Sequence, residues 1–229
     1  AQGWGVTRGA SDPGRDLLGD FQAAGFTYAA NATQLRAIPA GTDRLLGLFA
    51  FSNMNVALDK IGKRRGTSRV VDDFGFPDQP MLDEMTDAAL TVLNRNPNGF
   101  VLMIEGASID KQAHNMDTDR WILDTIEFDR AVERVRRFAL ANPDTLAVVT
   151  ADHECAGVNI IGASTVTNAS LQQRAAEGGG ATRLRDEVVA TYDAAGFPFY
   201  RILPDGYPES TDVDRRMLVG YAGNSDRNE

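Results

Sequence analysis

Cysteine and histidine are both scarce in this chain of 229 residues, which contains one cysteine, Cys155, and two histidines, His114 and His153. A single cysteine excludes a disulfide within the chain. It does not fix the redox compartment, because many exported bacterial proteins also lack disulfides.

Positive charge and long apolar runs are lacking as well. The formal net charge is −9, which argues against a nucleic-acid partner or an anionic membrane surface, since either would need a basic face on the protein. No apolar run approaches the ~20 residues of a membrane span. If the substrate is an anion, something other than the overall field must attract it, and bound cations would serve.

The chain also begins at Ala1, without a Met or a recognisable signal peptide. We therefore expect a processed product or a piece cut from something longer. The apolar fraction of 43% and the charged fraction of 24% are ordinary for a globular protein. Because there is no low-complexity segment and no convincing linker, we interpret residues 1–229 as a single domain.

The first third of the chain alternates short helix and strand patterns. A helix is predicted within residues 13–26, with Gly25 as its stop, and a short strand follows it. A second short helix is expected within 32–41, and then a buried strand over Arg44–Phe51. Residues 53–77 have a weaker pattern, which includes the basic segment "GKRRG", interpreted as an exposed loop.

The clearest pattern is a strand–helix–strand unit. An amphipathic helix over 80–99 precedes the apolar run "FVLMI", Phe100–Ile104, which we interpret as a strand. The long helix Thr118–Ala141 leads to a second apolar strand, Thr145–Thr150. Continuous apolar strands joined by a helix are typical of a parallel sheet covered on both faces, so the predicted class is α/β. In such sheets ligands bind beyond the carboxyl ends of the strands.

The long helix is expected to bury an apolar face. The residues of that face are Trp121, Ile122, Thr125, Ile126, Val132, Val135 and Phe138. The final third of the chain is less clear. It contains a Gly-rich loop, a helix ending at Gly196 and two further strand patterns, within 197–203 and 215–222.

Asp110 and His114 are four residues apart in the segment "EGASIDKQAH". On a helix this spacing places both side chains on one face, close enough to bind one ion. Carboxylate oxygen and imidazole nitrogen are normal zinc donors. Spacing alone favours the plainer alternative, in which Asp110 caps a helix and His114 lies on its exposed surface.

Asp152 and His153 form a second pair, directly after the second strand. Taken alone, this pair could be a plain polar loop. Both histidines of the chain, however, follow the ends of two consecutive strands, each with an aspartate nearby. Glu105, at the end of the first strand, adds a hard oxygen ligand suited to magnesium. The combination suggests two-metal chemistry, which clamps the attacking and leaving oxygens of a displacement at phosphorus.

Two neighbouring residues allow a functional and a plain interpretation. Cys155 could be a soft metal ligand, but the sequence favours a small buried residue. Lys111, beside Asp110, could reach a phosphate through water or could be a solvated surface lysine.

The segment "FVLMIEGASIDKQAH", followed about forty residues later by "TLAVVTADH", resembles the alkaline phosphatase family, and in particular the C-terminal part of its bacterial members. The likeness is densest from about Pro80 to Gly157 and extends upstream through "RLLGLFAFSNM". The resemblance implies an α/β fold of three layers, with a mostly parallel sheet between helices on both faces.

The resemblance also implies metal roles for particular residues, with Zn and Mg as cofactors. Glu105 corresponds to a magnesium ligand, and Lys111 to a position near the magnesium and the phosphate. The implied zinc ligands are Asp110 and His114 for the first ion and Asp152 and His153 for the second. The substrate would be a phosphomonoester.

Several parts of the family pattern have no counterpart in this chain. We find no Asp-Ser-Ala-like segment for the serine nucleophile, no upstream bridging aspartate, and no histidine after His153 to complete the first zinc site. The resemblance therefore implies a C-terminal fragment of a periplasmic or secreted alkaline phosphatase, with the serine upstream and with little or no turnover of its own. One expected partner is the missing N-terminal part of the same protein, which would cover an exposed strand edge. A second copy of the chain, forming a homodimer, is another possible partner.

Two alternatives remain open from the sequence. The first is another member of the same superfamily, such as a phosphodiesterase, a sulfatase or a mutase, although the segment "GASIDKQ" favours the phosphomonoesterase branch. The second is a non-catalytic module in which the Asp–His pairs bind a structural metal or none. A zinc titration separates these possibilities.

Overall fold

The computed structural model describes residues 14–51, 53–61, 77–163, 167–176, 200–210 and 217–222. These residues divide into two compact units. Unit 1 lies within residues 1–109 and 119–150, and unit 2 lies within residues 110–118 and 151–229. Each unit is described by itself. The expectation of one domain over 1–229 stays a prediction.

Unit 1 begins with two short helices, each with a capping side chain. In α1 (Leu17–Ala23) the side chain of Asp16 accepts a hydrogen bond from the backbone of Gly19, and in α2 (Ala32–Arg36) the side chain of Asn31 caps in the same way. Gly25 follows α1 with φ +86°, a left-handed conformation that glycine adopts without strain. Both helices and the Gly25 stop are as the sequence predicts.

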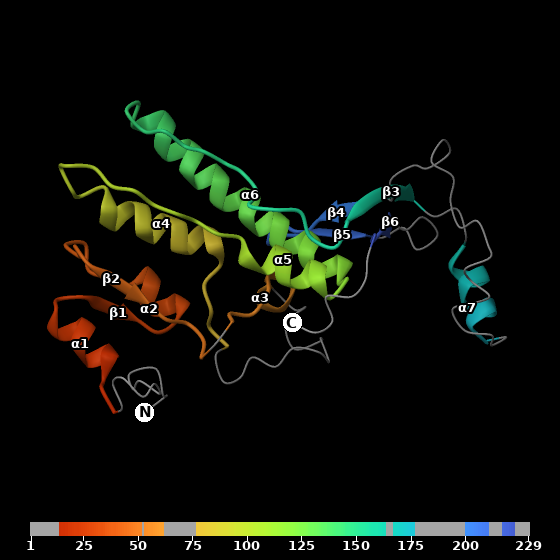
Figure 1. Cartoon of the computed structure of the whole chain (residues 1–229), viewed down its shortest axis with the longest axis horizontal. Coiled ribbons are helices and arrows are strands. Elements are labelled where there is room, and N and C mark those ends of the chain that lie inside the picture. Colours follow the sequence, from red (N-terminus) through yellow and green to blue (C-terminus); the bar gives the residue numbers. More distant parts are fainter. Residues whose placement is uncertain are drawn as a thin grey trace. The chain divides into compact units, whose positions relative to one another are not determined.

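The strands β1 (Thr27–Ala29) and β2 (Leu45–Gly47) pair in parallel, with Thr27 opposite Leu45. They lie beside α2 in Figure 1, and a core cluster of Ala29, Leu35 and Phe49 packs there. The strand predicted over 44–51 is thus real but shorter, because only its first half has a partner in the ladder.

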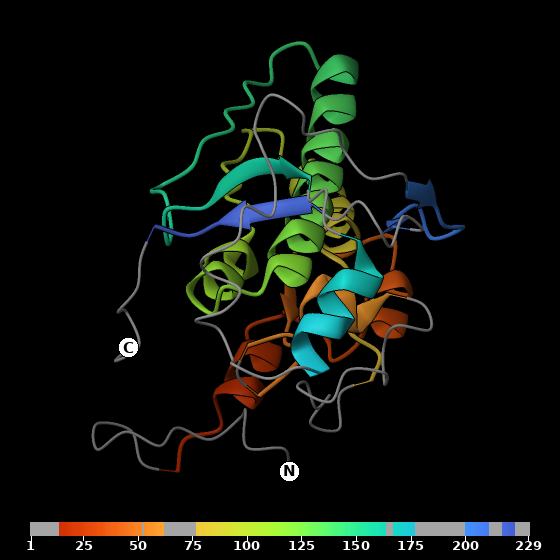
Figure 2. The same cartoon turned by 90° about the vertical axis from the view of Figure 1, so that its right-hand side faces the viewer.

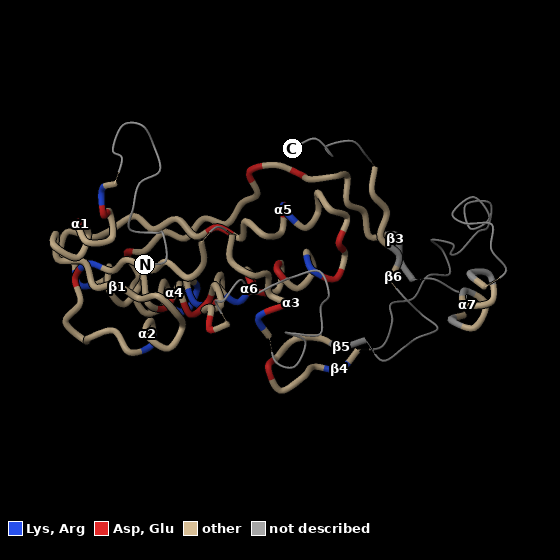
Figure 3. The backbone as a smooth tube through the Cα atoms, turned by 90° about the horizontal axis from the view of Figure 1, so that it is seen from below, with Lys and Arg blue, Asp and Glu red and all other residues tan. Residues whose placement is uncertain are grey.

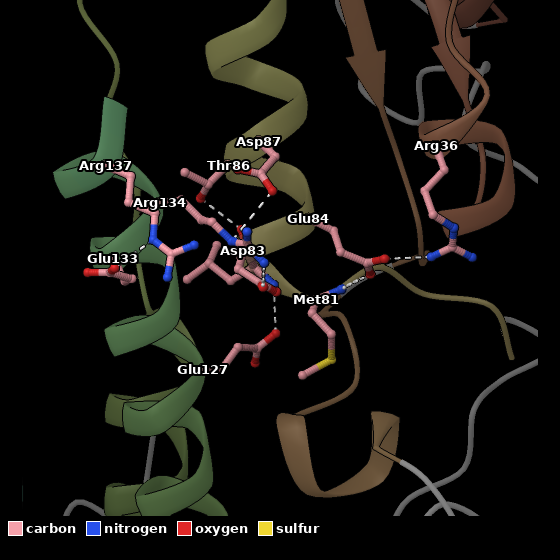
Figure 4. Close-up of polar contacts among 11 residues, drawn as sticks. Arg36, Met81, Asp83, Glu84, Thr86, Asp87, Glu127, Glu133, Arg134 and Arg137 are labelled. Atoms are coloured by element: carbon pink, nitrogen blue, oxygen red, sulfur yellow. Dashed lines mark hydrogen bonds and ion pairs between the residues drawn. The ribbon is translucent and has the colours of Figure 1, made fainter. Parts of the chain in front are cut away.

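Two long helices, α4 (Leu82–Leu93) and α6 (Thr118–Ala141), lie side by side in unit 1 (Figures 1 and 4). Arg134 of α6 reaches two carboxylates of α4, with 3.1 Å to Asp83 and 3.5 Å to Asp87. At the start of α4, the Glu84 carboxylate accepts a hydrogen bond from the backbone of Met81 at 2.9 Å. The predicted helices are confirmed, and α6 has the predicted bounds.

The buried face of α6 is charged, which contradicts the predicted apolar face. Its buried residues are Arg120, Leu123, Asp124, Glu127 and Ala131, whereas the predicted residues such as Val132 and Phe138 are only half-buried. In the C-terminal half of the predicted face, Val132, Val135 and Phe138 line an open groove instead of a closed core. Periodicity thus located this half of the apolar stripe but could not show what covers it.

The charged face of α6 belongs to a buried ionic cluster, formed by Asp59, Lys60, Arg120, Asp124 and Glu127. Asp59 and Lys60 are the last two residues of α3 (Ala57–Lys60). The Lys60 ammonium lies 2.5 Å from Glu127, and the Arg120 guanidinium lies 3.3 Å from Asp59. Glu127 also accepts a hydrogen bond from the backbone of Leu82 at 2.7 Å, so the cluster ties α3, α4 and α6 together.

The segments Phe100–Ile104 and Thr145–Thr150 are not strands, which corrects both predictions. They run as extended chain after α4 and α6 (Figure 1), and neither pairs with a strand among the described residues. Val101 is 96% exposed and Leu146 is 87% exposed. A strand exists only where a ladder partner supplies its hydrogen bonds. Both segments line one groove of about 840 Å³, whose floor includes Phe128 and Phe138 of α6.

Unit 2 contains two antiparallel strand pairs. β3 (Asn159–Ala163) pairs with β6 (Met217–Gly220), as Figure 2 shows, and the register shifts between Ile160 and Gly162. β4 (Tyr200–Ile202) pairs with β5 (Pro208–Ser210). The strands predicted within 197–203 and 215–222 contain β4 and β6. Since β1–β2 is the one parallel pair among the described residues, the three-layer, mostly parallel sheet stays a prediction.

The remaining described helices are α5 (Ala107–His114), which connects the two units, and α7 (Asn168–Ala176). The "GKRRG" loop and the helix predicted to end at Gly196 lie outside the described residues. Acidic and basic residues are both spread along the described chain (Figure 3). Among the helices of the described part, none has the length and apolar character that a membrane span requires.

Candidate metal centre

Helix α5 places Asp110 and His114 on one face, one turn apart. The distance from His114 Nε2 to Asp110 Oδ1 is 3.4 Å. The helix is held at its end by Met116, which has φ +55° and donates its backbone N–H to the Ala113 carbonyl at 2.9 Å. Ala113 itself is buried, so the two side chains stand on a fixed turn.

The second pair, Asp152 and His153, lies at the start of an unusual turn. Ala156 has φ +58° and Gly157 has φ +61°. A left-handed alanine costs about 1–2 kcal/mol, so the surrounding contacts must hold it. The Glu154 carboxylate accepts a hydrogen bond from the Gly157 backbone, and the Ala156 carbonyl accepts one from Ala222 at 3.1 Å.

The turn brings His153 close to Asp110. His153 Nε2 lies 3.8 Å from Asp110 Oδ1 and 3.7 Å from Asp152 Oδ2. Its Nδ1 lies 2.8 Å from the Glu154 carbonyl, which can only accept, so Nδ1 carries the hydrogen and the lone pair of the neutral ring is on Nε2. That hydrogen bond, followed by the Asp152 and Asp110 carboxylates, raises the pKa of His153 above its ordinary value.

Cys155 is the residue whose place the sequence did not reveal. Its sulfur, one oxygen of Asp110 and one nitrogen of His114 all lie within 4.8 Å of one another. The thiol donates a hydrogen bond to the backbone carbonyl of Asp110 at 3.7 Å. The residue is half-buried, so the favoured prediction of a small buried residue is incomplete. Its position two residues after His153 was the available signal.

These donors fit a metal ion by their chemistry and by one unsatisfied atom. Asp110 Oδ1 is buried and accepts no hydrogen bond from the described residues, which is costly for a carboxylate oxygen without a partner. Donors about 2.0 Å from a tetrahedral zinc ion stand roughly 3.3 Å apart, close to the spacing of Asp110 Oδ1 and His114 Nε2. A cation there would satisfy the oxygen.

The other predicted site residues are not part of this cluster. Glu105 is exposed and belongs to unit 1. Asp152 is exposed, and its carboxylate also accepts a hydrogen bond from the backbone of His153 at 3.1 Å. Lys111 is exposed, and its carbonyl accepts a hydrogen bond from the Asn115 side chain at 3.0 Å. The metal and phosphate roles of these residues stay predictions.

The sequence model of the family described as alkaline phosphatase matches residues 3–195. This chain belongs to the alkaline phosphatase family. It is 37% identical over 149 residues to alkaline phosphatase H of Pseudomonas aeruginosa, covering 61% of this chain and 31% of that protein. It is 36% identical over 151 residues to the alkaline phosphatase of Escherichia coli K12, covering 61% and 32%. The chain thus spans about a third of the length of these curated relatives.

Solved structures agree with this assignment. The alkaline phosphatase of Thermus thermophilus superposes with a TM-score of 0.55 at 26% identity, covering 78% of this chain and 33% of that one. A cold-active alkaline phosphatase from Shewanella sp. superposes with a TM-score of 0.52 at 30% identity, covering 69% and 35%. The chain therefore has an alkaline-phosphatase-like α/β fold, and the resemblance seen in the sequence is confirmed.

Proposed function

We propose that this chain is the part of a metal-dependent phosphomonoester hydrolase that holds most of its metal ligands. The observation that carries the proposal is the position of Asp110 Oδ1 between two imidazole nitrogens, 3.4 Å from His114 Nε2 and 3.8 Å from His153 Nε2. A carboxylate shared between two such nitrogens is suited to two neighbouring cations.

The residues would divide among three ions. Asp110 and His114 would hold a first zinc ion, and Asp152 and His153 a second. Glu105 would contribute to a magnesium site, because hard carboxylate oxygens suit that ion. One neighbour of similar fold, a TAB5 alkaline phosphatase variant, is described as having Mg bound in its M3 site; it is 18% identical to this chain, with a TM-score of 0.52.

Bound cations would supply the positive charge that an acidic chain lacks, and would lower the energy of negative oxygens at phosphorus. The part played by this chain is to fix the donors. The Glu154 carbonyl orients the His153 ring, and the turn of α5 sets the spacing of Asp110 and His114. Lys111 would approach the phosphate through water. The serine that attacks phosphorus is expected in the upstream part of the parent protein.

The groove of unit 1 supports the proposal that the chain is a fragment. Two extended apolar segments, 100–104 and 145–150, line it without strand partners among the described residues. The matched part of the chain covers about a third of the relatives' length, so the missing N-terminal part is the expected occupant and would complete a mostly parallel, three-layer sheet. The parent is expected in the periplasm or outside the cell. A homodimer is a further expected assembly.

The proposal predicts that the isolated chain hydrolyses a chromogenic phosphate monoester slowly or not at all, with zinc and magnesium present, because it lacks the nucleophile. The comparison is an intact family member assayed in the same buffer. Comparable turnover by the chain alone would contradict the proposal that the serine nucleophile lies outside this chain. Zinc should nevertheless bind, as measured by calorimetry.

The ligand assignment is tested by His114→Ala, with Asn115→Ala as a matched control from the same end of α5. Loss of the imidazole should weaken zinc binding on the order of tenfold to a hundredfold. Asn115 is exposed and its side chain donates a hydrogen bond to the Lys111 carbonyl, so its variant should keep the parent affinity. Equal affinities in both variants would rule out His114 as a ligand.

A further inference from the structure

We propose that Tyr221 is a positioning residue of the candidate metal centre. Its hydroxyl forms a 2.7 Å hydrogen bond with the hydroxyl of Thr118, and the next residue, Ala222, contacts the turn that follows His153. The inference rests on the proposed metal centre and goes beyond it, because the tyrosine is assigned no metal. Its role is to hold together the two backbone segments on which the ligands lie.

The turn that follows His153 is fastened to the end of β6. The Ala156 carbonyl accepts a hydrogen bond from the Ala222 backbone at 3.1 Å. A Cβ on Gly157 would lie 2.2 Å from the Ala222 side chain, so the two backbones are in direct contact. The strand β3, which begins shortly after Gly157, is itself paired with β6. The left-handed turn and residues 221–222 are therefore held as one piece, as strained backbone at a site requires.

The other partner of the bond, Thr118, is joined to the ligands of α5. The Asp117 backbone donates a hydrogen bond to the Gln112 carbonyl at 3.0 Å. Gln112 lies in α5 between the proposed ligands Asp110 and His114. Because Thr118 directly follows Asp117, its hydroxyl is tied to the helical turn that carries both ligands.

The bond between the two hydroxyls therefore connects the two halves of the centre. Asp110 Oδ1 lies 3.8 Å from His153 Nε2, so donors from segments far apart in sequence must be kept at a fixed separation. The Tyr221–Thr118 bond is half-buried and of ideal length. The Cys155 thiol also bridges the segments, 3.7 Å from the Asp110 carbonyl, but S–H is a weak donor. Groups that orient ligands raise metal affinity, because less ordering is left for the ion to impose.

The test removes each hydroxyl in turn and measures zinc affinity by calorimetry. Tyr221→Phe keeps the aromatic ring, and Thr118→Val keeps the shape of the side chain. Each variant should bind zinc on the order of tenfold more weakly than the unchanged chain. The double variant should bind no more weakly than either single variant, because both changes remove the same bond. Thr118→Ser is the matched control; it keeps the hydroxyl and should keep the affinity.

A hydroxyl pair that only stabilises the fold would give a different result. Urea unfolding without metal would then show a loss of stability in Tyr221→Phe, while zinc affinity stayed equal in all the chains. That outcome, or losses that add in the double variant, would overturn the role of Tyr221 and leave the proposed metal centre intact. No zinc binding by the unchanged chain would overturn both. If circular dichroism shows Tyr221→Phe unfolded, Thr118→Val and Thr118→Ser make the same test from the other side of the bond.

Discussion

Two groups of ionisable side chains, one in each unit, deal with their charge in opposite ways. In the buried ionic cluster of unit 1, basic side chains neutralise two carboxylates: Lys60 pairs with Glu127, and Arg120 pairs with Asp59. The candidate centre of unit 2 leaves Asp110 Oδ1 without a hydrogen bond among the described residues and places it near two imidazole nitrogens. The first arrangement pairs two of its carboxylates with Lys60 and Arg120, while Asp124 Oδ2 accepts no hydrogen bond from the described residues. The second arrangement has no Lys or Arg partner for Asp110 in the described part of the chain and is the proposed metal site.

Burial follows the same division. The side chains of Lys60 and Glu127 are 5% and 6% exposed, whereas those of Asp110 and His153 are 39% and 55% exposed. A charged group kept from water needs a fixed partner, while a ligand must be reachable by the ion. The buried acidic groups of unit 1 therefore hold helices together, whereas the exposed acidic groups of unit 2 are free of that task and are proposed to bind an ion.

The largest expected effect comes from breaking the buried pair. Lys60→Met leaves the Glu127 carboxylate buried without its cation, which costs about 3–5 kcal/mol in the free energy of unfolding. Urea unfolding measures the loss. The control is Arg36→Met, because Arg36 is 55% exposed although it lies 2.5 Å from Glu84, and such surface pairs contribute about 1 kcal/mol or less. Similar losses in both variants would remove the distinction between the buried cluster and the surface.

A medium effect tests the turn that supports the candidate centre. Gly157→Ala adds a Cβ that would lie 2.2 Å from the Ala222 side chain, at φ +61°, whereas Gly99→Ala at φ +80° meets nothing within 4 Å. Both variants bear the cost of a left-handed alanine. Overpacking should lower the unfolding free energy of Gly157→Ala by about 1–3 kcal/mol more than that of Gly99→Ala. Equal urea midpoints of Gly157→Ala and Gly99→Ala would show that the turn accommodates the added methyl group without a packing cost.

A third expected effect is a dependence of stability on pH in unit 1. Burial, followed by the neighbouring Glu127, raises the pKa of Asp124 from 3.8 to about 7. The folded state therefore binds this proton more tightly than the unfolded state, and the stabilisation present below pH ~4 is lost as the pH rises through ~7. Urea unfolding between these values should show that decline in the unchanged chain.

The matched variants for this slope are Asp124→Asn and Asp129→Asn, both on α6. Asn cannot ionise, and its oxygen can still accept the bond that Asp124 Oδ1 accepts from Ala57 at 3.2 Å, so the first variant should have the flatter profile. Asp129 is exposed, and its variant should keep the slope. A parallel decline in all three proteins would assign the pH effect elsewhere.

The sequence predicted helices well because their signals are local. The periodicity of 118–141 and the Gly25 stop depend on neighbours within a few residues, and both are confirmed. The strand predictions at 100–104 and 145–150 failed because apolar content shows that a segment needs cover, while a strand needs a partner that may lie far along the chain. The same limit explains the buried face of α6.

The candidate site was half visible in the sequence. The spacing of Asp110 and His114 predicts their common face on a helix, which the structure shows at 3.4 Å. The approach of Cys155 depends on two left-handed residues in succession, Ala156 and Gly157. Only the glycine hints at such a conformation, since alanine seldom adopts it. The resemblance to alkaline phosphatases predicted the family correctly. The position of Cys155 beside Asp110 is seen only in the structure.

The open groove of unit 1 has a consequence for how this chain's stability is to be understood. Its lining includes Val101, Leu146 and Val148, side chains that are more than three-quarters exposed. Any polypeptide that covers them binds the folded chain and not the unfolded one, so folding and association are linked equilibria. The unfolding free energy is then a function of the concentration of that partner.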